Sequence, residues 1–166
     1  IPLLNDAAND IAPSPKQLCK YAEVLCLTST KDLTLSESGY RKLVLGNLEL
    51  FIDAAAVGPT YQPGHAHADT LSFELHLKGK PFIVDTGTST YEINDSRFHE
   101  RSTKAHNTVT INDENSSEVW AGHRVAKRAN VTIHKDNSDS IVASHDGYLK
   151  RFRVRHRRDF MLSADG

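Results

Sequence analysis

The chain has 166 residues, of which 39% are hydrophobic and 25% charged, so it is long enough to bury one hydrophobic core and falls within the size range of a single domain. Twenty lysines and arginines stand against 21 acidic residues, and this balance indicates neither a nucleic-acid nor a membrane partner. No run of about 18 apolar residues occurs, so the sequence predicts no membrane-spanning helix.

Residues 1–38 are predicted to form a lead-in loop and one helix. The first 13 residues are polar and contain two prolines, which is typical of a loop that leads in from something upstream. Ser14 and Pro15 then read as an N-cap and a proline at the first helical position, and apolar residues recur at helical spacing after them. We expect one helix over 15–27.

The only two cysteines, Cys19 and Cys26, both fall in this predicted helix. Seven residues of helix place them about 10 Å apart along its axis, which is too far for a disulfide. We interpret them as small buried apolar residues, so they do not reveal the redox compartment. The chain begins at Ile1 without a signal-peptide pattern, and localisation is not readable from its ends.

From Gly39 to the C-terminus the hydrophobic period is two, with short β-rich runs between turn residues. Many short antiparallel strands are typical of a sandwich or a jelly roll. We therefore predict a mainly β chain: an antiparallel β-sandwich portion over 39–166, preceded by one short N-terminal helix. Because the chain stops on turn-type residues at 163–166, we expect the sandwich to be truncated. The predicted strands are 40–46, 48–56, 70–78, 81–85, 107–112, 123–134, 140–145 and 148–163.

The stretch from Gly64 to Asp69 reads Gly-His-Ala-His-Ala-Asp and precedes the strongest strand pattern in the chain. If it is extended, side chains two residues apart share one face, so His65, His67 and Asp69 point the same way. A bulge near Asp69 and Thr70 that re-aims them is the alternative. Either arrangement predicts a ligand or proton-transfer cluster.

Asp85, which ends an apolar run, and His106, which opens a predicted strand, are further candidate metal ligands. Two imidazoles and one carboxylate bind zinc with a fourth position open, or non-haem iron as a facial triad. One such set is His67, Asp85 and His106. A jelly-roll oxygenase would instead use His67, Asp69 and His106. Ordinary polar residues at strand ends are the competing interpretation, and residue chemistry alone leaves the choice open.

Three further features bear on function. The polar connection 86–106 is longer than most connections in compact domains, which favours a functional role.

Trp120 and Arg124 lie close together in the sequence and are candidates for stacking on and binding a sugar, with core packing as the alternative for the tryptophan. The segment 150–158 alternates so that four arginines share one strand face, although a solvated edge is the simpler interpretation; without aromatic residues on that face it does not favour nucleic acid. These arginines are Arg151, Arg153, Arg155 and Arg157.

Several ordered motifs resemble the heparinase II/III-like family of polysaccharide lyases. They span about residues 38–130, and three of them in order at family-like spacing are far more specific than any one alone. The motifs are Gly64 to Phe73, Asp85-Thr86-Gly87 with Tyr91, Arg101 to Val109, Ser116 to Trp120, and Arg124 to Ala126.

The resemblance implies an α/α toroid followed by an antiparallel β-sandwich, with the catalytic cleft between them, so that this chain corresponds to the first part of the sandwich. By motif, His67, Asp85 and His106 match the family's ligands for a divalent metal, usually zinc. His65 matches a cleft-facing residue with an acid/base or substrate-positioning role. Tyr91 is the second candidate catalytic residue, with packing on the sandwich as the alternative.

The expected reaction is β-elimination on a uronate-containing glycan, in which the proton at C5 is removed and the 4-linked oxygen is expelled. The expected partners are an acidic polysaccharide and the missing toroid domain, and the resemblance implies a periplasmic or extracellular location. We expect the isolated chain to bind a divalent metal but not to cleave polysaccharide. A jelly-roll oxygenase and a non-catalytic carbohydrate-binding sandwich are the alternatives.

Overall fold

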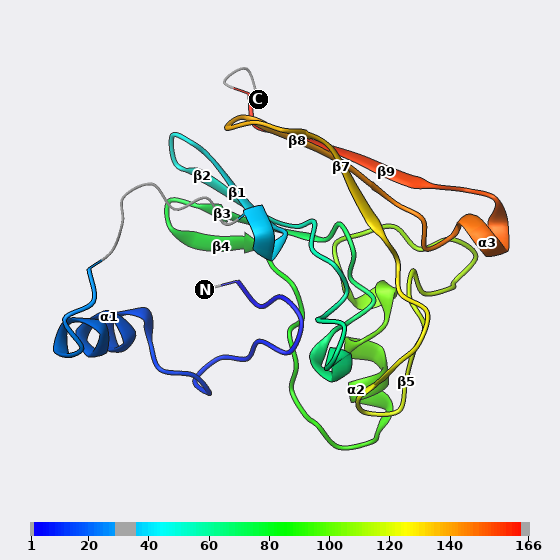
Figure 1. Ribbon diagram of the computed structural model, residues 1–166, viewed down its shortest axis with the longest axis horizontal. Coiled ribbons are helices and arrows are strands. Elements are labelled where there is room, and N and C mark those ends of the chain that lie inside the picture. The colour runs from blue at the N-terminus through cyan, green and yellow to red at the C-terminus, as the bar shows by residue number, and fades with distance from the viewer. Residues whose placement is uncertain (1, 29–35, 164–166) are drawn as a thin grey trace.

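The computed structural model describes residues 2–28 and 36–163. The turn-type residues 164–166, on which the expected truncation rests, and residues 29–35 of the predicted lead-in lie outside the described residues. Antiparallel strands in three sheets dominate, and the two larger sheets carry the core (Figure 1). The prediction of a mainly β, antiparallel sandwich is confirmed. Within the described ranges, no helix is long and apolar enough to cross a membrane.

The first large sheet is a meander of four neighbouring antiparallel strands, each paired with the next along the chain. Its two tight turns use left-handed backbone, with Gly46 at φ 57° in one and Lys78 and Gly79 at φ 53° and 71° in the other, and glycine adopts this conformation without strain. The turn residues thus set the strand register. The strands are β1 (Tyr40–Leu45), β2 (Leu48–Asp53), β3 (Phe73–Leu77) and β4 (Lys80–Ile83).

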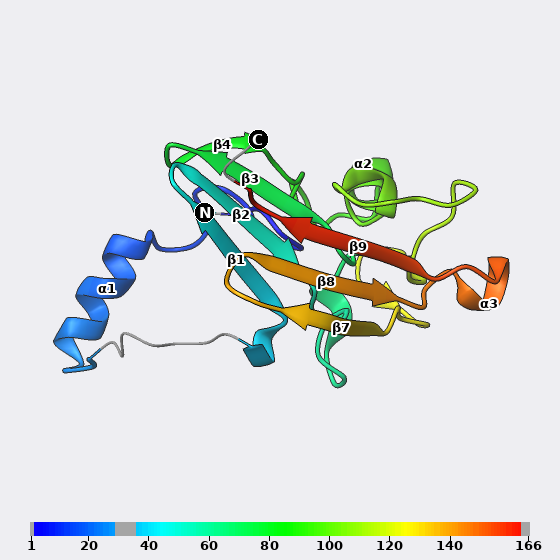
Figure 2. The same ribbon diagram turned by 90° about the horizontal axis from the view of Figure 1, so that it is seen from above.

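The second large sheet has the order β7 (Val131–Asp136), β8 (Ser140–His145) and β9 (His156–Met161), all antiparallel. Apolar residues of the two sheets form one core, and the rings of Phe73 and Phe160 meet across it with centroids 6.2 Å apart. Figure 2 shows β7–β9 next to the first sheet. The buried core cluster contains Leu43, Leu50, Ile52, Ala54, Leu71, Ile141, Ala143 and Phe160.

The opposite face of the first sheet is polar and is covered by the lead-in segment. Glu74 and His76 of β3 are 1% and 5% exposed, whereas Leu77 is 40% exposed. The Leu3 amide donates to Glu74 Oε1 over 2.6 Å, and His76 Nε2 lies 3.2 Å from Glu74 Oε2. The buried Glu74 carboxylate is therefore paired both within β3 and with a segment more than 70 residues away in sequence.

Three predicted strands are wrong. Residues 107–112 hold only an isolated bridge, and 123–134 divides into β6 (Arg124–Val125), which pairs with β5 (Val119–Trp120), and the start of β7. The run 148–163 begins with α3 (Leu149–Phe152), after which Arg153 takes a left-handed φ of 60°. Since only part of this run is a strand, the stripe of four arginines on one strand face does not form.

The helical content also differs from the prediction. Helix α1 (Pro15–Val24) starts at the expected Ser14 cap but ends three residues early, and Figure 1 shows it apart from the sheets. Its residues are not buried, and Cys19 and Cys26 are both exposed and unbridged, so their interpretation as buried residues is wrong. The polar connection contains α2 (Asp95–Glu100), capped by Asn94, which sequence periodicity did not reveal.

Candidate functional site

The histidine motif is a turn rather than a strand. Residues Pro63–His65 form one 3₁₀ turn, and the strand β3 begins only at Phe73. Between them the buried Leu71 adopts a left-handed φ of 62°, which breaks the alternation of side chains. The expectation of an extended stretch is therefore wrong, and a turn, not the alternative bulge, re-aims the residues that precede β3.

One carboxylate gathers the two histidines of the motif. Asp6, in the lead-in segment, places Oδ2 2.8 Å from His65 Nδ1 and Oδ1 2.8 Å from His67 Nε2. Arg97 of α2 binds both oxygens of the same carboxylate, with Nη2 3.0 Å from Oδ2. Burial by itself would raise the pKa of Asp6, but the hydrogen bonds from His67, Arg97 and His65 hold it well below its usual range.

The lead-in reaches this position because the Asp-Thr-Gly motif lets it pass closely. The amide of Thr88 donates to the carbonyl of Ala7 over 3.0 Å, and a Cβ on Gly87 would lie 2.4 Å from that same oxygen. Gly87 also has a φ of 59°. Asn5 Oδ1 accepts from the amide of His67 over 3.0 Å, which fixes the neighbouring residue of the lead-in on the motif.

Asp85 and His106 form a second buried pair behind the first. Both side chains are fully buried, and His106 Nδ1 lies 2.9 Å from each carboxylate oxygen of Asp85. The rings of His67 and His106 are neighbours, with centroids 5.3 Å apart. The structure thus brings the three residues of the predicted zinc set into one region.

The hydrogen bonds determine which ring nitrogens are free. A carboxylate only accepts, so His67 carries its proton on Nε2 toward Asp6, and His106 carries its proton on Nδ1 toward Asp85. Within the described part of the chain, the remaining nitrogens, His67 Nδ1 and His106 Nε2, are buried without a hydrogen-bond partner. Burial lowers the pKa of His67, which keeps that imidazole neutral. Two buried lone pairs are therefore available to a metal ion.

The oxygenase residue Asp69 lies nearby in a different environment. It is 2% exposed, and among the described residues its Oδ2 has no hydrogen-bond partner. Burial and the charge of Asp53 raise its pKa well above the ordinary value. Asp69 and Asp53 both line a cleft of about 450 Å³, together with Tyr40 and His65.

His65, which lines this cleft, and the neighbouring Tyr91 both face solvent. The His65 side chain is 64% exposed, and its ring centroid lies 5.9 Å from that of Tyr91 and 5.9 Å from that of His123. Arg97 lies over the Tyr91 ring at 5.2 Å from its centroid. Tyr91 is therefore part of an aromatic group beside His65, in addition to being a loop residue.

Trp120 and Arg124 face each other across the β5–β6 hairpin, where they are partners in register. Trp120 is 51% exposed, so the core-packing interpretation is wrong. The buried guanidinium of Arg101 connects this hairpin to the histidine motif, because it donates to the carbonyls of Ala66 and Ala121 over 3.0 and 3.1 Å. The candidate sugar-binding pair is thus attached to the same scaffold.

The model of the family described as heparinase II/III-like, C-terminal, matches residues 28–166. The chain belongs to this heparinase II/III-like family. No curated protein sequence matches it. Among solved structures it is similar to a heparinase III gene product (18% identity, TM-score 0.66), to heparinase III (20%, 0.65) and to the heparan sulfate lyase HepC from Pedobacter heparinus (20%, 0.65).

These similarities to heparinase structures cover 95–96% of this chain but only 27–28% of theirs. At 18–20% identity they establish the fold of the sandwich. Asp6 precedes the region matched by the heparinase II/III-like model, which begins at residue 28. The carboxylate that joins His65, His67 and Arg97 is therefore contributed from outside the matched region.

Proposed function

We propose that this chain is the β-sandwich part of a polysaccharide lyase that cleaves uronic-acid-containing glycans by β-elimination. The observation that carries the proposal is the pair of imidazoles on Asp6: one exposed at a cleft and one buried beside Asp85 and His106. Membership of the heparinase II/III-like family supports the reaction class. A polymeric substrate also agrees with a periplasmic or extracellular site of action.

His65 is the proposed acid/base residue. Because Asp6 holds its proton on Nδ1, the lone pair of His65 lies on Nε2. This lone pair can accept the C5 proton of a uronate, so His65 can act as a general base. The Asp6 carboxylate then stabilises the imidazolium that forms. Tyr91, 5.9 Å away between ring centroids, is the second proposed catalytic residue.

His67, Asp85 and His106 are the proposed ligands of a divalent metal, Zn²⁺ by donor chemistry. The donor types fit, since each histidine has a buried ring nitrogen without a partner in the described chain. The Asp85 carboxylate lies against His106 Nδ1, on the side of that ring away from Nε2, so it must move to bind the same ion. A bound ion would supply positive charge and hold the connection that carries His106 against the motif that carries His67. In the chain itself, Asp85 orients the His106 imidazole, and the burial of His67 and His106 excludes water.

Substrate binding also involves groups outside the histidine and aspartate cluster. We propose that Trp120 stacks on a sugar and Arg124 binds its acidic group at the exposed hairpin. Neutralisation of the uronate carboxylate is assigned to an upstream α/α toroid, which forms the other wall of the cleft. The chain alone is then a metal-binding but inactive part of the lyase.

Metal analysis of alanine variants tests the ligand set. The chain is purified with Zn²⁺, dialysed against metal-free buffer, and its zinc content is measured per chain. We expect His67→Ala, Asp85→Ala and His106→Ala each to lose the retained zinc. His99→Ala, which removes an exposed histidine of α2, is the matched control and keeps it. Circular dichroism confirms that each variant is folded.

The same experiment decides between the two ligand sets. The oxygenase set is the second candidate because, within the described chain, the buried Asp69 Oδ2 has no hydrogen-bond partner. Zinc retained by Asp85→Ala but lost in Asp69→Ala would replace the proposed ligand set with His67, Asp69 and His106. Zinc retained by both His67→Ala and His106→Ala would remove the metal centre from the proposal.

A further inference from the structure

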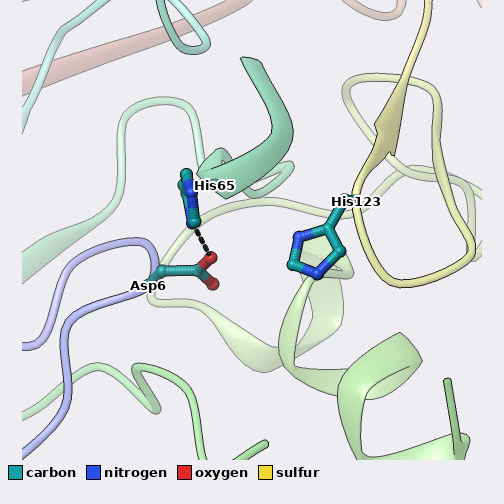
Figure 3. A group of neighbouring side chains, drawn as sticks. All are labelled: Asp6, His65 and His123. Atoms are coloured by element: carbon teal, nitrogen blue, oxygen red, sulfur yellow. Dashed lines mark hydrogen bonds and ion pairs between the residues drawn. The ribbon is translucent and has the colours of Figure 1, made fainter. Parts of the chain in front are cut away.

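A second group of candidate metal ligands lies around His65, which lines the cleft, and Figure 3 shows its members. Asp6, His65 and His123 come from three separate segments: the lead-in, the 3₁₀ turn and the loop between β5 and β6. One donor atom from each lies within 4.8 Å of the other two. Among the residues that the structure describes, this is the group that meets that distance, whereas His67, Asp85 and His106 would have to move closer.

The composition and exposure of this group suit a transition-metal ion. Two imidazoles and one carboxylate form a three-ligand set typical of zinc, which completes its coordination with water. His65 and His123 are exposed, so an ion can enter from solvent and keep a water ligand. His123 Nδ1 lies 3.4 Å from the carbonyl of Gly64, which places its ring beside the turn that carries His65.

The surroundings also predict that this group binds an ion weakly. The Asp6 carboxylate already accepts from Arg97 through both oxygens and from His67 through Oδ1. The guanidinium charge opposes a nearby cation, and a carboxylate shared among several donors gives less charge to the ion. In the inner set of His67, Asp85 and His106 the carboxylate differs in this respect. Among the ion pairs of the described residues, Asp85 pairs with His106 and not with an arginine.

We propose that Asp6, His65 and His123 form a second, weaker Zn²⁺ site, and that an ion bound there withdraws His65 from proton transfer. If Zn²⁺ binds His65 Nε2, it occupies the lone pair directly. If it binds Nδ1, the ring proton moves to Nε2, and again no basic nitrogen faces the substrate. The inhibitory part of this proposal rests on the proposed lyase function, whereas the site itself does not.

Equilibrium dialysis of the chain against increasing Zn²⁺ tests the site. We expect two bound ions per chain with different affinities. His123→Ala should lose the weaker ion and keep the tighter one, while His106→Ala should lose the tighter ion and keep the weaker one. His99→Ala, an exposed histidine outside the group, should keep both. Retention of both ions by His123→Ala would overturn the proposal.

The outcomes separate this site from the proposed function. If His106→Ala keeps both ions but His123→Ala loses one, the inner metal centre fails and the outer site stands. A folded His65→Gln variant must also lose the weaker ion, because it removes a second ligand; if it keeps that ion, the assignment of His65 is wrong. Thermal denaturation of each variant without metal shows that lost binding does not reflect unfolding.

The inhibitory part is tested in a longer protein that carries the proposed upstream helical domain. Excess Zn²⁺ should lower its lyase rate on the order of 100-fold, the loss expected when a general base is removed. The ratio of rates without and with excess Zn²⁺ should approach one in His123→Ala. An equal ratio in wild type and His123→Ala would refute inhibition through this site, whatever the dialysis shows.

Discussion

At the scale of single residues, Asp6 determines the state of the site. It accepts from two imidazoles and one guanidinium, so it fixes the tautomers of His65 and His67 and neutralises the charge of Arg97. Arg97 is fully buried and also donates to the carbonyl of Gly122 and the hydroxyl of Thr88, over 2.9 and 2.6 Å. The buried cation is thus acceptable only while Asp6 is present.

Replacing Asp6 by alanine should therefore destabilise the chain by about 3 kcal/mol, because the Arg97 charge is left buried and unpaired. The double variant Asp6→Ala/Arg97→Met should recover most of that loss, since it removes the unpaired charge and keeps the volume. Urea unfolding followed by circular dichroism measures both. Asp159→Ala breaks the exposed pair with Arg157 and is the control, with little expected effect. A double variant no more stable than Asp6→Ala would contradict the account.

At the scale of elements, β1–β4 and β7–β9 depend on a few backbone positions and buried polar pairs. Gly39, which precedes β1, has a φ of 79°, and its carbonyl accepts from the amide of Ala54 over 3.2 Å. A Cβ there would lie 2.2 Å from the Cα of Ala55. Gly46, in the β1–β2 turn, has a similar φ of 57° but nothing within 4 Å of such a Cβ.

These two glycines separate steric exclusion from backbone strain. Gly46→Ala should cost about 1 kcal/mol, the price of a left-handed conformation for a residue with a Cβ. Gly39→Ala should cost about 3 kcal/mol or more, because the backbone of Ala55 must also move. Denaturant midpoints of the two variants measure the difference. Equal midpoints would show that the contact at Gly39 relaxes freely.

A buried histidine pair joins β8 to β9. His145 and His156 are partners in register, and His145 Nε2 lies 2.9 Å from His156 Nδ1. The amide of Gly147 donates to His145 Nδ1 over 3.2 Å, so that nitrogen must carry a lone pair. Burial, and then the neighbouring His156, lower the pKa of His145 to about 4, and burial lowers that of His156 as well.

The second sheet should therefore lose stability in acid. A histidine whose pKa is lowered in the fold binds its proton more readily when unfolded, so its contribution is complete above about pH 6.5 and is lost as the pH falls toward 4. The limiting slope is about 1.4 kcal/mol per pH unit for each histidine. His145→Asn should flatten the slope of unfolding free energy in this window, whereas His99→Asn should not. An unchanged slope in His145→Asn would refute the assignment.

At the scale of the whole molecule, the chain leaves several large apolar side chains exposed. It spans about 27% of the length of the heparinase structures that it resembles. Helix α1 carries its apolar side chains in solvent, with Leu18, Tyr21 and Val24 at 54%, 62% and 70% exposure. Phe82 of β4 is likewise 68% exposed. A domain that covers them is part of the proposed function.

The chain alone should therefore fail to cleave a uronate-containing polysaccharide. Activity is measured by the ultraviolet absorbance of the unsaturated uronate product, with zinc present at one equivalent. A longer protein that carries the proposed helical domain should be active, and His65→Gln in that protein should lower the rate on the order of 100-fold or more. His99→Gln is the matched control. Product formed by the chain alone would refute the division of the site between two domains.

The sequence by itself determined the class of fold and the central motif. Alternating apolar residues and turn glycines predicted the strands that the structure has as β1–β4, and the Ser14-Pro15 cap predicted the start of α1, because both signals depend on residues adjacent in the chain. The family motifs named His67, Asp85 and His106, and the structure places them in one region. Their metal remains a proposal.

Only the tertiary structure decided how the motif is oriented and what completes the site. Asp6 lies 61 residues before His67 and 91 before Arg97, and nothing in its local sequence marks it. The left-handed turn at Leu71 and the helix after Asn94 likewise arise from packing and capping rather than from hydrophobic period. Asp6 pairs with His65, His67 and Arg97 because the fold brings them together, and their charges and hydrogen bonds then match. A pattern of neighbouring residues in the sequence carries no information about such long-range contacts.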